Sequence, residues 1–223
     1  ALKYSYSMEK SCYSYLIQGT CLNNLGLSYL YSGNSQKALD CFSESLKIIK
    51  SCGYDESRSH NNIGTAYCMI GDYQMAKLSF ETASKLQKND PFMIKCISSN
   101  LALALYKTNC KDQAIDLVDK IIHEFHENKD CISDTVVYCS ALINKGFFFF
   151  SEGDFENAEK YYNESLFHKY RASDDKYRRK RLGMIKLSNN LETPESSIID
   201  LTDLGSNLFY KPYSVVPFAF YVI

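Results

Sequence analysis

A small residue followed twelve positions later by an alanine recurs four times along the 223 residues of this chain. The four alanines lie 38, 38 and 44 residues apart. A period of roughly 20 to 50 residues is typical of repeat proteins, in which each unit packs on its neighbours. The spacing therefore predicts a stack of similar units, built on the pairs Gly26 and Ala38, Gly64 and Ala76, Ala102 and Ala114, and Gly146 and Ala158.

The residues around each pair also recur in kind, as in the second unit: Ile63, Gly64, Tyr67, Gly71, Asp72, Tyr73, Ala76 and Phe80. This pattern resembles the tetratricopeptide repeat, whose small and large positions fall where two antiparallel helices meet. A small residue at the crossing point lets the helices approach closely, and an aromatic side chain fills the adjacent hole. The resemblance implies an all-α fold, a right-handed α-solenoid of antiparallel helix hairpins.

Short turns are expected between the two helices of each unit. Gly71 and Gly153 can take the left-handed conformation that ends a first helix, and the aspartates that follow them can cap the second. The third unit departs from this pattern, since Asn109 stands in place of the glycine and Leu105 in place of an aromatic residue.

The repeat phase predicts the boundaries along the chain. Residues 1–18 read as the second helix of an earlier repeat, so we expect a fragment of a longer protein. Four repeats follow, residues 173–191 form a polar capping helix, and 192–223 lie outside the repeats. The expected repeats are about 19–52, 57–90, 95–128 and 139–172, which makes residues 1–172 one repeat domain.

Composition limits the classes of partner and the cellular location that this chain could have. The formal net charge is −1, so no overall field favours nucleic acid, although the basic run Lys176–Arg181 leaves an acidic partner open as an alternative to a solvated face. No apolar run is long enough to cross a membrane. Nine cysteines, odd in number and without a Cys-x-x-Cys pair, are typical of reduced thiols and predict a cytoplasmic location.

No motif predicts catalysis, a cofactor or a metal. The segment His123-Glu124-Phe125-His126 spaces its histidines three apart, whereas the zinc-protease helix needs four. No phosphate loop or nucleophile elbow occurs. The sequence therefore predicts a non-enzymatic binding protein.

One asparagine stands two residues before the small residue of every first helix: Asn24, Asn62, Asn100 and Asn144. Stacked helices would place these four, the asparagine ladder, at intervals of roughly 10 Å. Each amide offers an acceptor and a donor, the pair that one peptide unit of an extended ligand needs. The Asn23-Asn24 and Asn61-Asn62 doublets resemble the first helices of kinesin light chains and of Gram-positive peptide-pheromone receptors. In the alternative interpretation, the amides bond the neighbouring helix and only fix the stacking.

Other residues of the same helix face are expected to set specificity in a concave groove. Arg58 and Lys107 are candidate partners for a ligand carboxylate. Asn23 and Asn61 occupy the place where chaperone-binding repeats carry a basic residue, so a chaperone tail is not the expected ligand. The candidate apolar anchors are Leu27, Tyr31, Met69, Leu103, Phe147 and Phe150.

The last residues differ in kind from the repeats. Leu208–Ile223 is rich in aromatic and β-branched residues and contains Pro212 and Pro217, which predicts extended chain rather than helix. So apolar a segment should pack on the solenoid, pair with a strand or dock on a missing part of the parent.

These features predict a protein-interaction or sensor module in a larger regulatory protein. Its partner would be a protein or an extended peptide, bound in the groove. The alternative is a structural spacer or an oligomerisation array without a groove ligand, which makes contact with another copy or with the rest of the parent protein.

Overall fold

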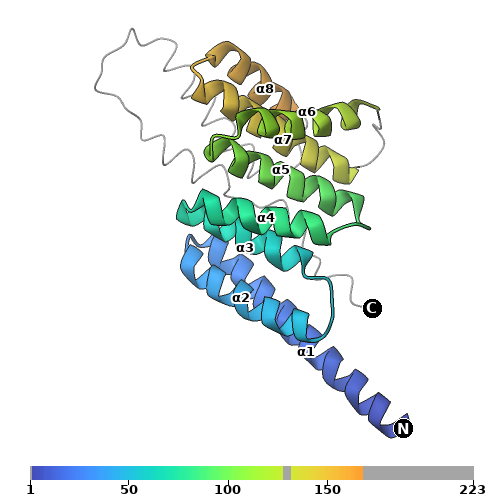
Figure 1. Cartoon of the computed structure of the whole chain (residues 1–223). Coiled ribbons are helices and arrows are strands. Elements are labelled where there is room, and N and C mark those ends of the chain that lie inside the picture. The colour runs from blue at the N-terminus through green and yellow to red at the C-terminus, as the bar shows by residue number, and fades with distance from the viewer. Residues whose placement is uncertain (1, 128–131, 168–223) are drawn as a thin grey trace. The chain divides into compact units, whose positions relative to one another are not determined.

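The computed structural model describes residues 2–127 and 132–167, which are helical apart from short turns and contain no strand. They divide into two units, described separately here. The first runs to Asn100 and the second starts at Leu101, so α5 (Pro91–Lys107) begins in one and ends in the other. The first unit also holds α1 (Leu2–Tyr31), α2 (Ser35–Ser51), α3 (Ser57–Ile70) and α4 (Tyr73–Leu86); the second holds α6 (Lys111–Glu127), α7 (Ile132–Ser151) and α8 (Phe155–Phe167) (Figure 1).

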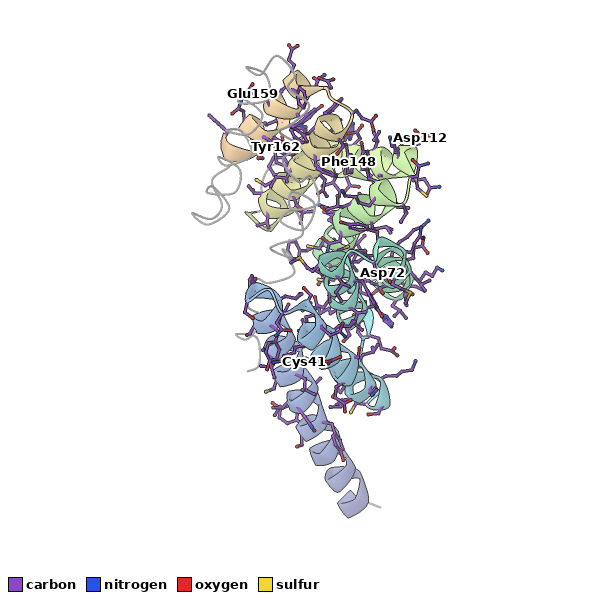
Figure 2. The ribbon with its side chains drawn as sticks, turned by 90° about the vertical axis from the view of Figure 1, so that its left-hand side faces the viewer. Cys41, Asp72, Asp112, Phe148, Glu159 and Tyr162 are labelled. Carbon is purple, nitrogen blue, oxygen red and sulfur yellow. The ribbon has the colours of Figure 1, made fainter. Side chains whose placement is uncertain are left out.

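The turns between paired helices share one geometry. Gly33, Gly71 and Gly153 have positive φ angles of 79°, 93° and 82°, and Asn109 takes the same region at 65°. After each of the three glycines the following residue, Asn34, Asp72 or Asp154, caps the next helix. Asp72 Oδ1 accepts a hydrogen bond from the backbone N–H of Met75 at 3.0 Å, which satisfies one of the unpaired donors of α4 (Figure 2).

The hairpins are antiparallel and close at the predicted small residues. Gly26 lies against the ring of Phe42. Gly19, two helical turns earlier in α1, lies against Ile49, which is further along α2. The same contact joins Gly64 to Phe80 and Gly146 to Tyr162, whose ring is buried between α7 and α8 (Figure 2). The predicted all-α fold of helix hairpins is confirmed. In these three hairpins the aromatic residue that fills the crossing comes from the second helix.

Each unit has its own apolar interior. In the first, a core from α1, α2 and α3 is formed by Leu27, Leu30, Ala38, Phe42, Ile63 and Ala66. A smaller cluster joins α4 to the start of α5 through Ala83, Met93 and Ile97. In the second unit, Phe125 of α6 stacks on Tyr138 of α7, with ring centroids 3.9 Å apart.

A network of polar side chains connects α5, α6 and the end of α7 within the second unit. The Tyr106 hydroxyl shares its one proton between Glu152 Oε1 at 2.6 Å and the backbone oxygen of Phe148 at 3.0 Å, while its ring stacks on that of Phe148. Lys111 Nζ donates to the same Glu152 oxygen at 2.6 Å. Hydrogen bonds from Lys111 and Tyr106 hold the pKa of the Glu152 carboxyl below its usual value.

The N-terminal boundary differs from the expectation. Residues 1–18 and the helix after them were expected to be separate, but α1 is one helix through Leu2–Tyr31 with no turn near residue 18. Gly19 does not interrupt it, because the space of the missing side chain is taken by Ile49, 3.1 Å from where a Cβ would lie. The expected capping helix 173–191 and the tail 192–223 lie outside the described residues.

Candidate functional site

Two hydrogen bonds between asparagines join the first helices of neighbouring repeats in the first unit. Asn62 Nδ2 of α3 donates to Asn23 Oδ1 of α1 at 2.8 Å. Asn100 Nδ2 of α5 donates to Asn61 Oδ1 of α3 at 3.0 Å. In both bonds a ladder asparagine contacts the residue before the ladder position in the preceding repeat. The doublets therefore have a structural role, and the stacking interpretation has direct support.

These bonds leave two polar atoms of α3 without a hydrogen-bond partner in the structure. The side chain of Asn61 is fully buried and that of Asn62 is 4% exposed. Asn62 Oδ1 and Asn61 Nδ2 have no partner. A buried acceptor and a buried donor left unpaired each cost free energy, so such atoms call for a water or a ligand group. The two atoms are one acceptor and one donor, on side chains that bond different neighbours: Asn62 bonds Asn23 of α1, and Asn61 bonds Asn100 of α5.

The other ladder residues differ in exposure. Asn24 of α1 is exposed, and Asn100 is half-buried. Asn144 of the second unit is 6% exposed and lies in the interior. Within the first unit, the ladder asparagine most open to a ligand is thus Asn24.

The two predicted basic residues are engaged by protein groups. Arg58 Nη2 lies 3.3 Å from Asp90 Oδ2, and Asp90 in turn caps α5 by accepting from the backbone N–H groups of Phe92 and Met93. An acidic ligand at Arg58 would have to compete with Asp90. In the second unit, Lys107 Nζ lies 4.7 Å from the ring centroid of Phe147, and burial lowers the pKa of this ammonium.

Half of the predicted apolar anchors belong to the interior. Leu27, Leu103 and Phe147 are 8%, 3% and 4% exposed. Tyr31 and Met69 are partly buried against the core of the first unit, and Phe150 packs edge-to-face on Phe155. The helix face that was expected to line a groove also meets neighbouring helices, because repeats pack along it. These side chains therefore stabilise the fold, and those that are buried offer little surface to a ligand.

Sequence reasoning missed two polar residues near this face, Asp90 and Gln87. Asp90 pairs with Arg58, and its position before Pro91 is a signal for a helix start that could have identified it as a cap. Gln87 was also missed. It is buried, and its Nε2 donates to Asp55 Oδ2 at 3.3 Å and to Ser57 Oγ at 3.1 Å, which ties the end of α4 to the start of α3.

Residues with other chemistry do not gather into a site. In residues 2–127 and 132–167 no group of three or more His, Cys, Asp or Glu side chains could hold a metal ion. His123 instead pairs with Glu127 at 3.6 Å. The thiols of Cys21 and Cys41 are free, and none of the helices in that part of the chain is both long and apolar enough to span a membrane.

Comparison with known proteins gives a consistent picture of the fold. Residues 16–89 and 140–166 match family models described as tetratricopeptide repeat. No curated protein matches the sequence. Among solved structures, the chain is similar to the apo form of the quorum sensor NprR from B. thuringiensis, at 19% identity and a TM-score of 0.52. The match covers 84% of this chain and 52% of that one, so this chain spans about half the length of NprR.

Proposed function

This chain belongs to the tetratricopeptide repeat family, and we propose that it is a protein-interaction module that holds an extended peptide along the first helices of its first unit. The unpaired donor and acceptor on Asn61 and Asn62 carry the proposal. Exposed Asn24 and half-buried Asn100 stand at the equivalent positions of the helices on either side. A peptide backbone repeats the same donor and acceptor along its length, so successive amides can hold it without reading its side chains.

Binding at this face requires the buried amides to become accessible. Asn62 is hydrogen-bonded to Asn23, and Asn61 is hydrogen-bonded to Asn100. A ligand that reaches these side chains therefore replaces a hydrogen bond between two amides with one between an amide and the ligand. Because the exchanged bonds are alike, the net gain comes from pairing the atoms that had no partner. Asn24 needs no such exchange and would be the first contact.

A spacer without a ligand is the second candidate function, and the inter-repeat bonds favour it. If the asparagines serve only the stacking, replacing Asn62 or Asn100 lowers the stability of the fold, whereas replacing exposed Asn24 changes neither stability nor binding. If they hold a peptide, replacing Asn24 weakens binding and leaves stability unchanged. Asn24 therefore separates the two functions better than the buried residues do.

The test uses random peptides displayed on phage and selected on the immobilised full chain. The affinity of enriched peptides is then measured for the wild type and for Asn24→Ala, with Asn163→Ala as the matched control. Asn163 is an exposed asparagine of α8 in the other unit. We expect Asn24→Ala to cost about 1–3 kcal/mol of binding free energy and Asn163→Ala to cost nothing measurable. Selection of no peptide, or of peptides indifferent to Asn24→Ala, would favour the spacer.

A regulatory setting is also part of the proposal. NprR is described as a quorum sensor, and the likeness to it is one of fold alone. We propose that the present chain serves as the sensing part of a regulatory protein. The selected peptides test this role, since a sensor should change its conformation on binding; an unchanged hydrogen-exchange pattern of α1 to α4 on saturation would contradict it.

A further inference from the structure

The outer face of α4 carries an exposed apolar stripe. Met75, Leu78 and Leu86 are 38%, 55% and 44% exposed. They stand at positions i, i+3 and i+11 with Thr82 between them, so all four share one side of the helix. We call these four residues the α4 stripe. Its length along the helix axis is about 17 Å.

The repeats provide an internal comparison for this face. Moving Met75, Leu78 and Thr82 by the repeat period of 38 residues gives Lys37, Asp40 and Glu44 on α2, and Gln113, Asp116 and Lys120 on α6, all exposed. The fourth residue, Leu86, corresponds to the half-buried Ile48 on α2 and Glu124 on α6. These helices carry polar residues where α4 carries Met75, Leu78 and Thr82. The hairpin fold therefore does not need apolar side chains at these positions, and the α4 stripe has another use.

The exposed apolar residues near the middle of α1 are a weaker candidate surface. Tyr13, Tyr15 and Ile17 are each about half exposed. Tyr13 and Ile17, four positions apart, share one side of the helix, whereas Tyr15 points to another side, so only two of the three residues form a stripe.

The sequence contains an apolar segment that suits the α4 stripe. Leu208–Ile223 has eleven large apolar residues among sixteen and only one charged side chain, Lys211. Its prolines Pro212 and Pro217 disfavour a helix, and five or six residues of extended chain at about 3.3 Å each match the length of the stripe. We propose that the α4 stripe is the docking site of Leu208–Ile223 of the same chain.

The connection favours this segment over a second copy of α4. Forty residues, 168–207, separate the segment from the last described residue, and such a length of chain can span roughly 130 Å when extended. Because the segment and the stripe belong to one chain, this connection presents the segment at an effective concentration that approaches the millimolar range. A second copy in a micromolar solution cannot match that concentration.

Leu78→Asp tests the proposal in the full chain. Aspartate is the residue that α2 and α6 carry at the equivalent position, so the fold should tolerate it, and the thermal unfolding midpoint should be unchanged. The readout is limited chymotrypsin cleavage within 208–223, which contains six Phe and Tyr residues. We expect cleavage about tenfold faster than in the wild type, because losing a half-buried leucine contact shifts docking by about that factor.

Ile115→Asp is the matched control. Ile115 is an exposed isoleucine of α6, 39% exposed, outside the stripe, and its replacement should leave the cleavage rate unchanged. Equal rates in the wild type and Leu78→Asp would overturn the proposal, as would equal acceleration by both variants.

A photoactivatable benzoylphenylalanine at position 78 gives a second, independent measurement. Mass spectrometry of the irradiated full chain should identify crosslinks to peptides from 208–223. Crosslinks from α4 to α4 of another copy would show that the stripe is a self-association surface and would overturn the proposal. Crosslinks to neither region would overturn it as well.

Discussion

Gly64 lies so close to Phe80 that an added Cβ would be 2.6 Å from the ring carbon Cε1. Gly26 with Phe42 and Gly146 with Tyr162 repeat this relationship at 2.6 and 2.7 Å. The third repeat fills its helix crossing with a different pair of residues. Ala102 and Val118 stand at the corresponding positions, and both are fully buried. A larger residue on the first helix is thus matched by a smaller one on the second.

This relationship predicts that Gly64→Ala and Phe80→Val compensate each other. Gly64→Ala alone should overpack the crossing and cost about 1–3 kcal/mol, while Phe80→Val alone leaves a cavity. The double variant reproduces the Ala102 and Val118 pair and should be more stable than the sum of the single effects allows. Urea unfolding of the four proteins measures the coupling. Strict additivity would show that the two residues do not share the crossing.

The hydrogen bond between the side-chain amides of Asn62 and Asn23 should contribute to the stability of the fold. In a double-mutant cycle, Asn23→Ala and Asn62→Ala should couple by about 0.5–1.5 kcal/mol, the usual worth of such a bond. The cycle of Asn24→Ala with Asn62→Ala is the control, because no bond joins that pair. A coupling energy equal in both cycles would mean that the 2.8 Å bond has no specific effect on folding.

Asn109 should behave as a replacement for glycine. Its φ of 65° is left-handed, so Asn109→Gly should leave the thermal midpoint unchanged or raise it. Asn109→Ala forces a Cβ into that region without a side-chain amide and should destabilise by about 1–2 kcal/mol. If alanine and glycine proved equivalent here, the turn of the third repeat would not need a left-handed residue.

Glu152 should make the stability of the second unit depend on acid. Its folded pKa is depressed by the hydrogen bonds from Lys111 and Tyr106, so its contribution is present above the pKa of the unfolded state. That contribution is lost as the pH falls through the lower, folded pKa. Glu152→Gln should remove this part of the acid dependence. Unfolding midpoints followed from neutral pH down to about pH 3 measure it, and parallel curves for both proteins would contradict the assignment.

The repeat spacing and turn residues were sufficient to predict the hairpins, because both depend on local rules. Gly71 and Asp72 illustrate this, since one permits a positive φ and the other caps the next helix. The continuity of α1 was not predictable in the same way. Glycine at position 19 is compatible with a helix end or with a tight contact, and only the presence of Ile49 decides between them.

For the candidate site, helical periodicity identified the face but not the partners across it. It placed Asn62 toward neighbouring first helices, yet the bond that forms is to Asn23 rather than to the equivalent Asn24. That offset depends on how far one helix slides along the next, which one sequence does not contain. Leu27 and Leu103 were expected at a groove for the same reason, because a face that meets another helix and a face that meets a ligand have the same spacing.

The unbroken run of α1 gives the first unit a mechanical property. Gly19 and Ile49 mark where α2 stops supporting it, and the part before residue 19 extends past α2 as a single rod (Figure 1). This rod is about 26 Å long, so each degree of tilt at Gly19 displaces its far end by about 0.4–0.5 Å. Leu2, at the far end of this rod, would thus move in proportion to any rotation of α1 against α2 about Gly19.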